Sequence, residues 1–213
     1  MIRRPLVGVL AVQGAFAEHE AMLHAVGADS RQVRTPDELT GLDGLVIPGG
    51  ESTTFGLVAE RSGLLPALRD AVSSGLPILG TCAGMIMLAR ATTGGAQPLV
   101  GGMDTVVRRN AFGRQVASFE AEIEMPAIGE EPVTAVFIRA PWIERAGPGV
   151  EVMATRDEHP VAARQGNLLV TAFHPELTDD TRVHALFVDM VRAAQARDGE
   201  DHAAGGAFGV RAQ

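Results

Sequence analysis

Lysine and tyrosine are absent from this chain of 213 residues, so all 18 of its basic residues are arginine. We interpret this as a compositional bias with one chemical consequence: the chain has no side-chain amine with which to form a Schiff base. Cysteine occurs once, as Cys82. A single cysteine excludes an internal disulfide and a cysteine-based zinc cluster, and it leaves one candidate thiol nucleophile.

Basic charge and long hydrophobic runs are also scarce. The 26 acidic residues give a net charge of −8, which argues against nucleic acid as the main ligand. No apolar run reaches transmembrane length, and no small-residue cleavage site follows the first apolar stretch. We therefore expect a cytoplasmic protein that does not bind membranes. We also expect one domain over residues 1–197 and a flexible C-terminal tail over residues 198–213, where Gly, Ala and charged residues dominate.

The most informative stretch of the sequence is residues 76–90. An apolar run at 76–79 predicts a buried strand, and residues 85–89 have helix-forming, apolar character. Cys82 lies between them in a Gly-x-Cys-x-Gly pattern, the thiol counterpart of a nucleophile elbow. The sharp turn leaves no room for a side chain at Gly80 or Gly84, and the new helix directs N–H groups at the sulfur and favours a thiolate. A buried core cysteine beside a tight turn fits the same pattern.

The surrounding pattern predicts an α/β fold. Strands and helices alternate over the first ninety residues, which favours a central, mostly parallel sheet with helices on both faces. The predicted strands are 6–12, 45–47 and 76–79, and the predicted helices are 15–26, a short one from 35, 52–62 and 64–73. Strands then follow at 118–124, 133–138, 150–154, 161–165 and 168–173 with no long helix between them. We expect these to extend the sheet antiparallel, before a final amphipathic helix around 183–191.

A cysteine nucleophile needs a base and a group that orients the base. His174 follows the predicted strand 168–173, and parallel strands end at one edge of a sheet, so His174 and Cys82 can meet there. Glu176 lies close enough to reach the other imidazole nitrogen. Taken alone, His174 could be structural and Glu176 could open a helix. We interpret the other histidines as surface or packing residues: His19, His24, His159, His184 and His202.

A third motif, Pro48-Gly49-Gly50-Glu51-Ser52-Thr53, also ends a strand and opens a helix. Its glycines can turn backbone N–H groups into the site, so that Gly50 and Ala83 would form an oxyanion hole. A phosphate-binding loop is one alternative, although the P-loop lysine is missing and Glu51 would repel phosphate. A simple turn from strand to helix is the other.

In chain order, the three motifs are residues 48–53, 80–84 and 174–176. Their order and spacing resemble those of the triad (class I) glutamine amidotransferases. Four further stretches narrow the resemblance to the glutaminase subunits of two-protein pyridoxal 5′-phosphate synthases: residues 8–14, 109–115, 118–120 and 137–141. The resemblance extends from about Leu6 to Arg192. It implies a single-domain, flavodoxin-like α/β fold for this chain.

The resemblance also implies an activity: hydrolysis of L-glutamine to L-glutamate and ammonia through a thioester. Cys82 would be the nucleophile, His174 the acid and base, and Glu176 its orienter. The substrate pocket would contain Gly50, Glu51, Ser52, Arg109, Ile138 and Arg139. An arginine there suits the α-carboxylate of glutamine, since a guanidinium can bind it with two hydrogen bonds.

The implied partner is the lyase subunit of pyridoxal 5′-phosphate synthase, which would receive the ammonia within a hetero-oligomer and build vitamin B6. This chain itself would bind no cofactor and no metal. Three alternatives stay open: a glutaminase that serves another pathway, a cysteine hydrolase or peptidase on the same sheet, and a non-catalytic thiol sensor that keeps the elbow cysteine for oxidation.

Overall fold

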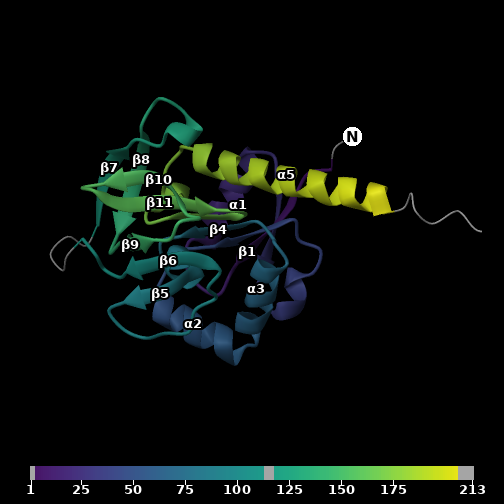
Figure 1. The fold of residues 1–213 in the computed structure, drawn as a ribbon, viewed down its shortest axis with the longest axis horizontal. Coiled ribbons are helices and arrows are strands. Elements are labelled where there is room, and N and C mark those ends of the chain that lie inside the picture. The colour runs from purple at the N-terminus through teal and green to yellow at the C-terminus, as the bar shows by residue number, and fades with distance from the viewer. Residues whose placement is uncertain (1–2, 113–117, 206–213) are drawn as a thin grey trace, which may run out of the picture.

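A computed structural model describes residues 3–112 and 118–205, and Figure 1 shows its arrangement. The central sheet has seven strands in the order β10-β11-β12-β4-β3-β1-β2. Its parallel strands are β1 (Leu6–Leu10), β2 (Asp29–Val33), β3 (Gly44–Ile47), β4 (Ile78–Thr81) and β12 (Leu168–Thr171). The strands β11 (His159–Gln165) and β10 (Glu151–Arg156) extend one edge antiparallel. The predicted mostly parallel sheet with an antiparallel extension is confirmed.

Helices cover both faces of this sheet, as predicted (Figure 1). The helices α1 (Phe16–Ala25) and α5 (Arg182–Gly205) lie on one face, and α2 (Ser52–Arg61) and α3 (Leu64–Ser73) lie on the other. The short α4 (Ala83–Leu88) follows β4 directly. Three turns of 3₁₀ helix complete the set: η1 (Pro36–Leu39), η2 (Pro126–Ile128) and η3 (Pro175–Leu177).

The register of the buried strands positions the site. Every residue of β3, β4 and β12 is buried, as expected for parallel strands covered on both faces. Thr171 of β12 pairs with Thr81 of β4, and Ile47 of β3 pairs with Gly80. The three strands therefore end level with one another. The residues that follow them meet at the carboxyl edge of the sheet, where ligands bind in open α/β sheets.

Two smaller sheets stand beside the central one. The strands β5 (Ala89–Thr93), β6 (Met103–Arg108) and β9 (Trp142–Ala146) form one, and β7 (Ser118–Ile123) and β8 (Val133–Ile138) form the other. The prediction of antiparallel additions to the central sheet was therefore wrong for β7 and β8, which pair with each other. The sequence analysis also missed β2, β5, β6 and β9, because polar residues interrupt the apolar pattern in each.

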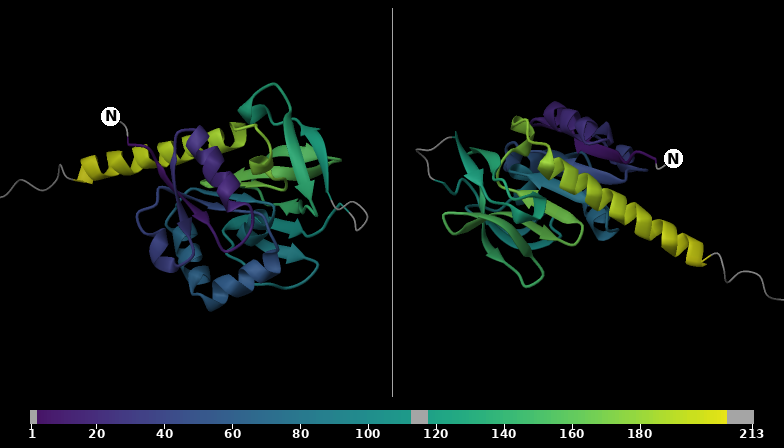
Figure 2. Two further views of the ribbon diagram at one scale, coloured as in Figure 1. Left: turned by 180° about the vertical axis from the view of Figure 1, so that it is seen from behind. Right: turned by 90° about the horizontal axis from the view of Figure 1, so that it is seen from above.

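The predicted C-terminal tail, residues 198–213, overlaps the end of helix α5. Helix α5 continues from Arg182 to Gly205, and its end projects beyond the body of the protein in Figures 1 and 2. Residues 198–205 are therefore helical. A single interior glycine costs a helix only about 1 kcal/mol, which an established helix can bear. Residues 206–213 lie outside the described part of the chain. Among the described helices, none is both long and apolar enough to cross a bilayer.

Candidate active site

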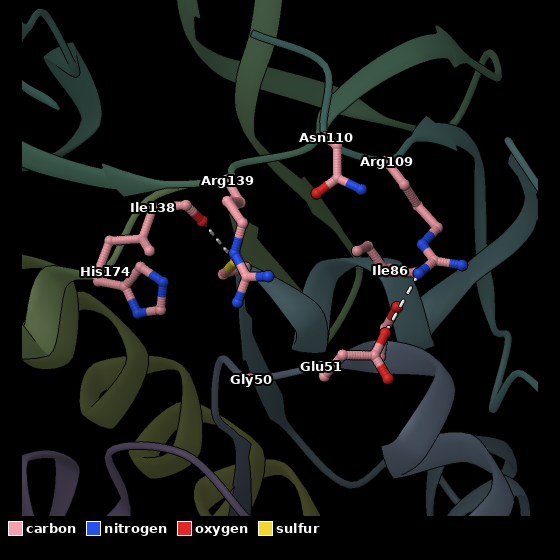
Figure 3. A pocket seen from close by; sticks show the side chains of 10 residues that line it. Gly50, Glu51, Ile86, Arg109, Asn110, Ile138, Arg139 and His174 are labelled. Carbon is pink, nitrogen blue, oxygen red and sulfur yellow. Dashed lines mark hydrogen bonds and ion pairs between the residues drawn. The ribbon is translucent and has the colours of Figure 1, made fainter. Parts of the chain in front are cut away.

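A cavity of about 230 Å³ opens at the carboxyl edge of the sheet (Figure 3). It brings together eight residues that the sequence analysis selected: Gly50, Glu51, Ser52, Cys82, Arg109, Ile138, Arg139 and His174. Ile86 and Asn110 complete the lining and were not predicted. Glu176 lies behind His174, and Ala83 is the first residue of α4. Segments far apart in the sequence thus supply one site.

Cys82 occupies a strained turn between β4 and α4. Its φ of 48° and ψ of −99° lie outside the regions that L-residues favour, and such strain costs on the order of 1–3 kcal/mol. The Cys82 N–H donates to the Thr171 carbonyl at 2.8 Å, which ties the turn to β12. A Cβ at Gly84 would lie 2.1 Å from the Ile47 carbonyl oxygen. The close approach of the backbone therefore requires glycine there, as predicted.

His174 and Glu176 form a buried pair at the end of the segment that follows β12. His174 Nδ1 lies 2.7 Å from Glu176 Oε1, and the His174 N–H donates to the Val136 carbonyl at 2.8 Å. Burial alone would lower the pKa of His174, but hydrogen bonding and charge from Cys82 and Glu176 raise it to about 10. The imidazole is therefore protonated near neutral pH and is an acid facing the sulfur.

The carboxylate of Glu176 is ionised under the same conditions. Burial would raise its pKa, but the contacts with His19 and His174 lower that pKa below its ordinary value. A buried anion of this kind must be held by donors on both oxygens. His174 Nδ1 lies 2.7 Å from one oxygen, and His19 Nε2 lies 3.3 Å from the other.

The thiol and two arginines line the same cavity as the glycine-rich loop. The Cys82 sulfur lies 3.9 Å from the Ile138 carbonyl oxygen, and Arg139 lies next to Ile138 at the cavity (Figure 3). Arg139 has a φ of 44°, a second strained residue at the site. Among the described residues its guanidinium has no ion-pair partner, so its charge is available to a ligand.

Glu51 has two roles in the structure. It caps α2, because its carboxylate accepts hydrogen bonds from the Thr53 and Thr54 N–H groups at 3.1 and 2.7 Å. It also lies 3.2 Å from Arg109 Nη2, across the mouth of the cavity (Figure 3). Partial burial would raise the pKa of Glu51, but the hydrogen bonds from Thr54 and Thr53 lower it to about 2. The cap fixes a negative charge at the cavity wall.

The segment that follows β1 contacts and supports the glycine-rich loop, residues 48–53. Gln13 Nε2 donates to the Glu51 carbonyl at 2.8 Å, and a Cβ at Gly14 would lie 2.0 Å from the Gly49 carbonyl oxygen. Gly50 has a φ of 144°, which favours glycine. On the inner side of the loop, a Cβ at Gly49 would lie 2.2 Å from Cε1 of His174. Gly49 and Gly50 are therefore both required: a side chain at Gly49 would collide with His174, and the backbone conformation at Gly50 favours glycine.

Of the histidines interpreted as surface or packing residues, His19 and His184 pack inside the protein. Both are fully buried, and His19 Nε2 lies 3.3 Å from Glu176 Oε2. The relevant signal was weak, because His19 precedes Glu176 by 157 positions and His184 by 165 positions. Only the packing of α1 against α5 and η3 brings the three residues together.

The protein has an α/β fold, with a cysteine at a strand-to-helix elbow and a His-Glu pair at the same edge of the sheet. This combination is typical of proteins that use a reactive thiol. Sequence comparison refines the class. The profile of the SNO glutamine amidotransferase family matches residues 9–193, so the chain belongs to that family.

Relatives and solved structures agree with this assignment. The pyridoxal 5′-phosphate synthase subunit PdxT of Frankia casuarinae is 58% identical over 192 residues, which cover 89% of this chain and 96% of the relative. The protein of the same name from Carboxydothermus hydrogenoformans is 53% identical over 185 residues, 87% of this chain and 97% of its own. A crystal structure of a glutamine amidotransferase superimposes with a TM-score of 0.82 at 46% identity, over 87% of this chain and 98% of that one.

Proposed function

We propose that this protein is the glutaminase subunit of a pyridoxal 5′-phosphate synthase. It hydrolyses L-glutamine to L-glutamate and ammonia, with Cys82 as nucleophile, His174 as acid and base, and Glu176 as orienter. The observation that carries the proposal is the convergence of Cys82 and the His174–Glu176 pair on one cavity that also holds two arginines. The family and the PdxT relatives support the same activity.

The first half of the reaction forms a thioester. The Cys82 thiolate attacks the carbon of the side-chain amide, a C–S bond forms, and the carbonyl oxygen becomes an oxyanion. The backbone N–H groups of Gly50 and Ala83 would stabilise that oxyanion. Protonated His174 then gives its proton to the amide nitrogen, the C–N bond breaks and ammonia leaves. His174 is neutral at this point, still held by Glu176.

The second half returns the enzyme to its starting state. Neutral His174 takes a proton from water as the oxygen attacks the thioester carbon, and a second oxyanion forms at the same place. This intermediate collapses, the C–S bond breaks, and the sulfur leaves as a thiolate beside the protonated imidazole. Glutamate departs with the new oxygen, and its acid proton passes to solvent. One molecule of water is consumed for each glutamine.

The charges around the cavity suit an amino acid substrate. Arg139 and Arg109 offer guanidinium groups to the α-carboxylate, and Glu51 offers a carboxylate to the α-ammonium group. Of the two arginines, Arg109 already faces Glu51 at 3.2 Å. We therefore assign the α-carboxylate to Arg139. Ser52 and the Ile138 backbone complete the wall that holds the side-chain amide near the sulfur.

The ammonia would pass to a synthase lyase subunit in a hetero-oligomer. The relatives are named as a subunit of pyridoxal 5′-phosphate synthase, and a subunit implies a partner. We propose the acidic surface, the Gln13-Gly14 turn and residues 109–115 as contact regions, of which residues 113–115 lie outside the described part of the chain. The cytoplasm is the proposed location.

The partner would also raise the activity. Free hydrolysis would waste glutamine, and the Gly49-Gly50 peptide can rotate because neither residue has a side chain. Docking would favour the orientation that completes the oxyanion hole by binding it more tightly. The test is steady-state glutamine hydrolysis at a fixed concentration of this subunit while a candidate synthase subunit is titrated in. An unchanged rate at saturating partner would exclude the activation and leave the triad assignment intact.

The activity itself is tested by incubating the purified protein with glutamine, with and without the candidate synthase subunit. Glutamate and ammonia should appear in equal amounts, and a glutamine-like electrophile should label Cys82 alone. Absence of both products under both conditions would refute the proposed function. Hydrolysis that persists after Cys82 is fully labelled would refute the covalent mechanism.

A further inference from the structure

A buried polar cluster lies directly behind the catalytic pair and is not explained by the reaction steps above. Glu176 presents Oε1 to His174 and directs Oε2 away from the cavity, into the protein. The Glu176 side chain and the His19 side chain are both fully buried. Within the described residues, Oε2 has no hydrogen bond of standard geometry, and His19 Nε2 lies 3.3 Å from it. Among the described residues, His19 is therefore the side chain that places a nitrogen against Oε2.

His19 is itself fixed from two further elements. Its Nε2 lies 3.3 Å from the Thr81 hydroxyl, on the strand residue that precedes Cys82. Its Nδ1 lies 2.9 Å from Nε2 of His184, on α5. The pKa of His184 is lowered to about 3, chiefly because burial disfavours its charged form. His184 is therefore a neutral imidazole at working pH.

The direction of these hydrogen bonds follows from the one nitrogen that has no partner. His184 Nδ1 is buried and makes no hydrogen bond within the described residues. A buried N–H without an acceptor is disfavoured more than a bare nitrogen, so His184 carries its proton on Nε2 and donates it to Nδ1 of His19. His19 then carries its own proton on Nε2, which lies 3.3 Å from both the Thr81 hydroxyl and Oε2 of Glu176.

We infer that His19, oriented by His184, is a positioning residue of the active site: its Nε2–H holds Oε2 of Glu176 and thereby fixes Oε1 against His174. The inference rests on the proposed glutaminase function, since it adds a residue to the same machinery. With an imidazole on each oxygen, the Glu176 carboxylate cannot rotate. The His174 ring is then held with its second nitrogen toward the sulfur.

Loss of His19 would leave a carboxylate oxygen buried without a donor. Burial would then raise the pKa of Glu176, and a protonated Glu176 holds a protonated His174 less well. The titratable groups that face Glu176 are His174 on its own segment, His19 on α1 and, beyond it, His184 on α5. Cys82 acts through His174, and the Thr81 hydroxyl is neutral. An acid limb in the pH dependence of kcat is therefore the expected signature.

The test uses three variants assayed with the synthase subunit present. His19→Leu removes the donor and keeps an apolar side chain of similar size. His19→Gln restores an N–H₂ group at about the reach of Nε2. His24→Leu is the matched control, because His24 lies exposed on the same helix. We expect kcat to fall about 10–100-fold in His19→Leu, as for other residues that orient catalytic ligands.

The expected pattern separates positioning from packing. In His19→Leu, KM should change little, and the acid limb of kcat should move to higher pH. His19→Gln should recover most of kcat and return the acid limb to its wild-type position, while His24→Leu should match the wild type. Wild-type kcat and pH dependence in folded His19→Leu would overturn the inference. So would a His19→Gln variant that is folded and as slow as His19→Leu.

A measurement on the wild-type protein tests the inference without relying on the folding of the variants or on enzyme activity. In protein labelled with ¹⁵N-histidine, the imidazole shifts report which nitrogen carries the proton. We expect Nε2 of His19 to carry a proton and its signal to shift in Glu176→Gln. A His19 with a bare Nε2 overturns the inference, even if the protein hydrolyses glutamine. An inactive wild type with a protonated Nε2 would instead refute the proposed function and preserve the hydrogen-bonded arrangement.

Discussion

Gly49 is the point at which one added methyl group should disable the site. It lies in the loop after β3, its Cα hydrogens face the His174 imidazole, and a Cβ there would lie 2.2 Å from Cε1, 3.0 Å from Nδ1 and 3.2 Å from Nε2. Its φ is not in the left-handed region, so alanine suits the backbone. The Gly49→Ala substitution therefore tests the position of His174 and little else.

The size of the effect follows from these distances. Carbon atoms are in favourable contact at about 3.5–4.0 Å, so the imidazole would retreat by more than about 1 Å. The ring has no room to retreat toward Glu176, which lies 2.7 Å from Nδ1. It would move relative to the sulfur instead. A displacement of about 1 Å at a reacting group can lower the rate about 10²-fold, which corresponds to about 2.7 kcal/mol.

The assay is glutamate release at saturating glutamine with the synthase subunit present, together with a thermal melt of each variant. The matched control is Gly149→Ala, whose Cβ would make only an ordinary contact, 3.5 Å from Gln165 Nε2, far from the cavity. Gly149→Ala should keep full activity. A Gly49→Ala variant that melts near the wild-type temperature and keeps kcat within about threefold would show that the exact position of His174 matters less than we argue.

Three other predictions concern the catalytic groups. Cys82→Ala should abolish hydrolysis and leave the melting temperature nearly unchanged, because loss of one sulfur leaves a small cavity; turnover by this variant would exclude a covalent mechanism. His174→Asn should lower the rate of hydrolysis nearly as much as Cys82→Ala. Glu176→Gln should lower it by less than the roughly 10⁴-fold seen for the equivalent change in a serine protease, since a thiolate depends less on the orienter. Equal and complete loss of activity in a folded Glu176→Gln would contradict this ranking. An NMR titration should find His174 protonated to about pH 10 in the wild type and to a lower pH in Cys82→Ala. The stability that protonated His174 contributes should therefore be complete below its ordinary pKa of 6.5 and decline as the pH rises toward 10.

The sequence was sufficient for the parts of the fold that depend on local pattern. The apolar runs of β1, β3, β4 and β12 are buried, and the parallel pairing of β1, β3 and β4 follows from the helices between them. The elbow was predictable for a steric reason, since Gly84 lies against the Ile47 carbonyl oxygen and no other residue fits. Parallel strand ends then place Cys82 and His174 at one edge.

The elements that the sequence did not reveal are those determined by tertiary contacts rather than by local sequence pattern. Strand β2 (Asp29–Val33) is polar and lies at the edge of the sheet, so its pairing with β1 determines it rather than its own pattern. The hairpin of β7 and β8 has the alternation of a half-exposed strand, and nothing in that alternation states which sheet it joins. Glu51 shows the same limit at the scale of one residue, because its role as the cap of α2 is visible only once the helix start is known.

The segment from Gln13 to His19 connects these observations. Its first residue holds the Glu51 carbonyl, and Gly14 lies against the Gly49 carbonyl oxygen, so this segment supports the loop that faces His174. Six residues after Gln13, His19 contacts Glu176 from the other side. One turn and one helix therefore touch both the oxyanion loop and the carboxylate that orients His174. Because packed elements move as units rather than deforming continuously, a partner bound to the Gln13-Gly14 turn would change the oxyanion loop and the triad together, and the two effects should appear in the same titration.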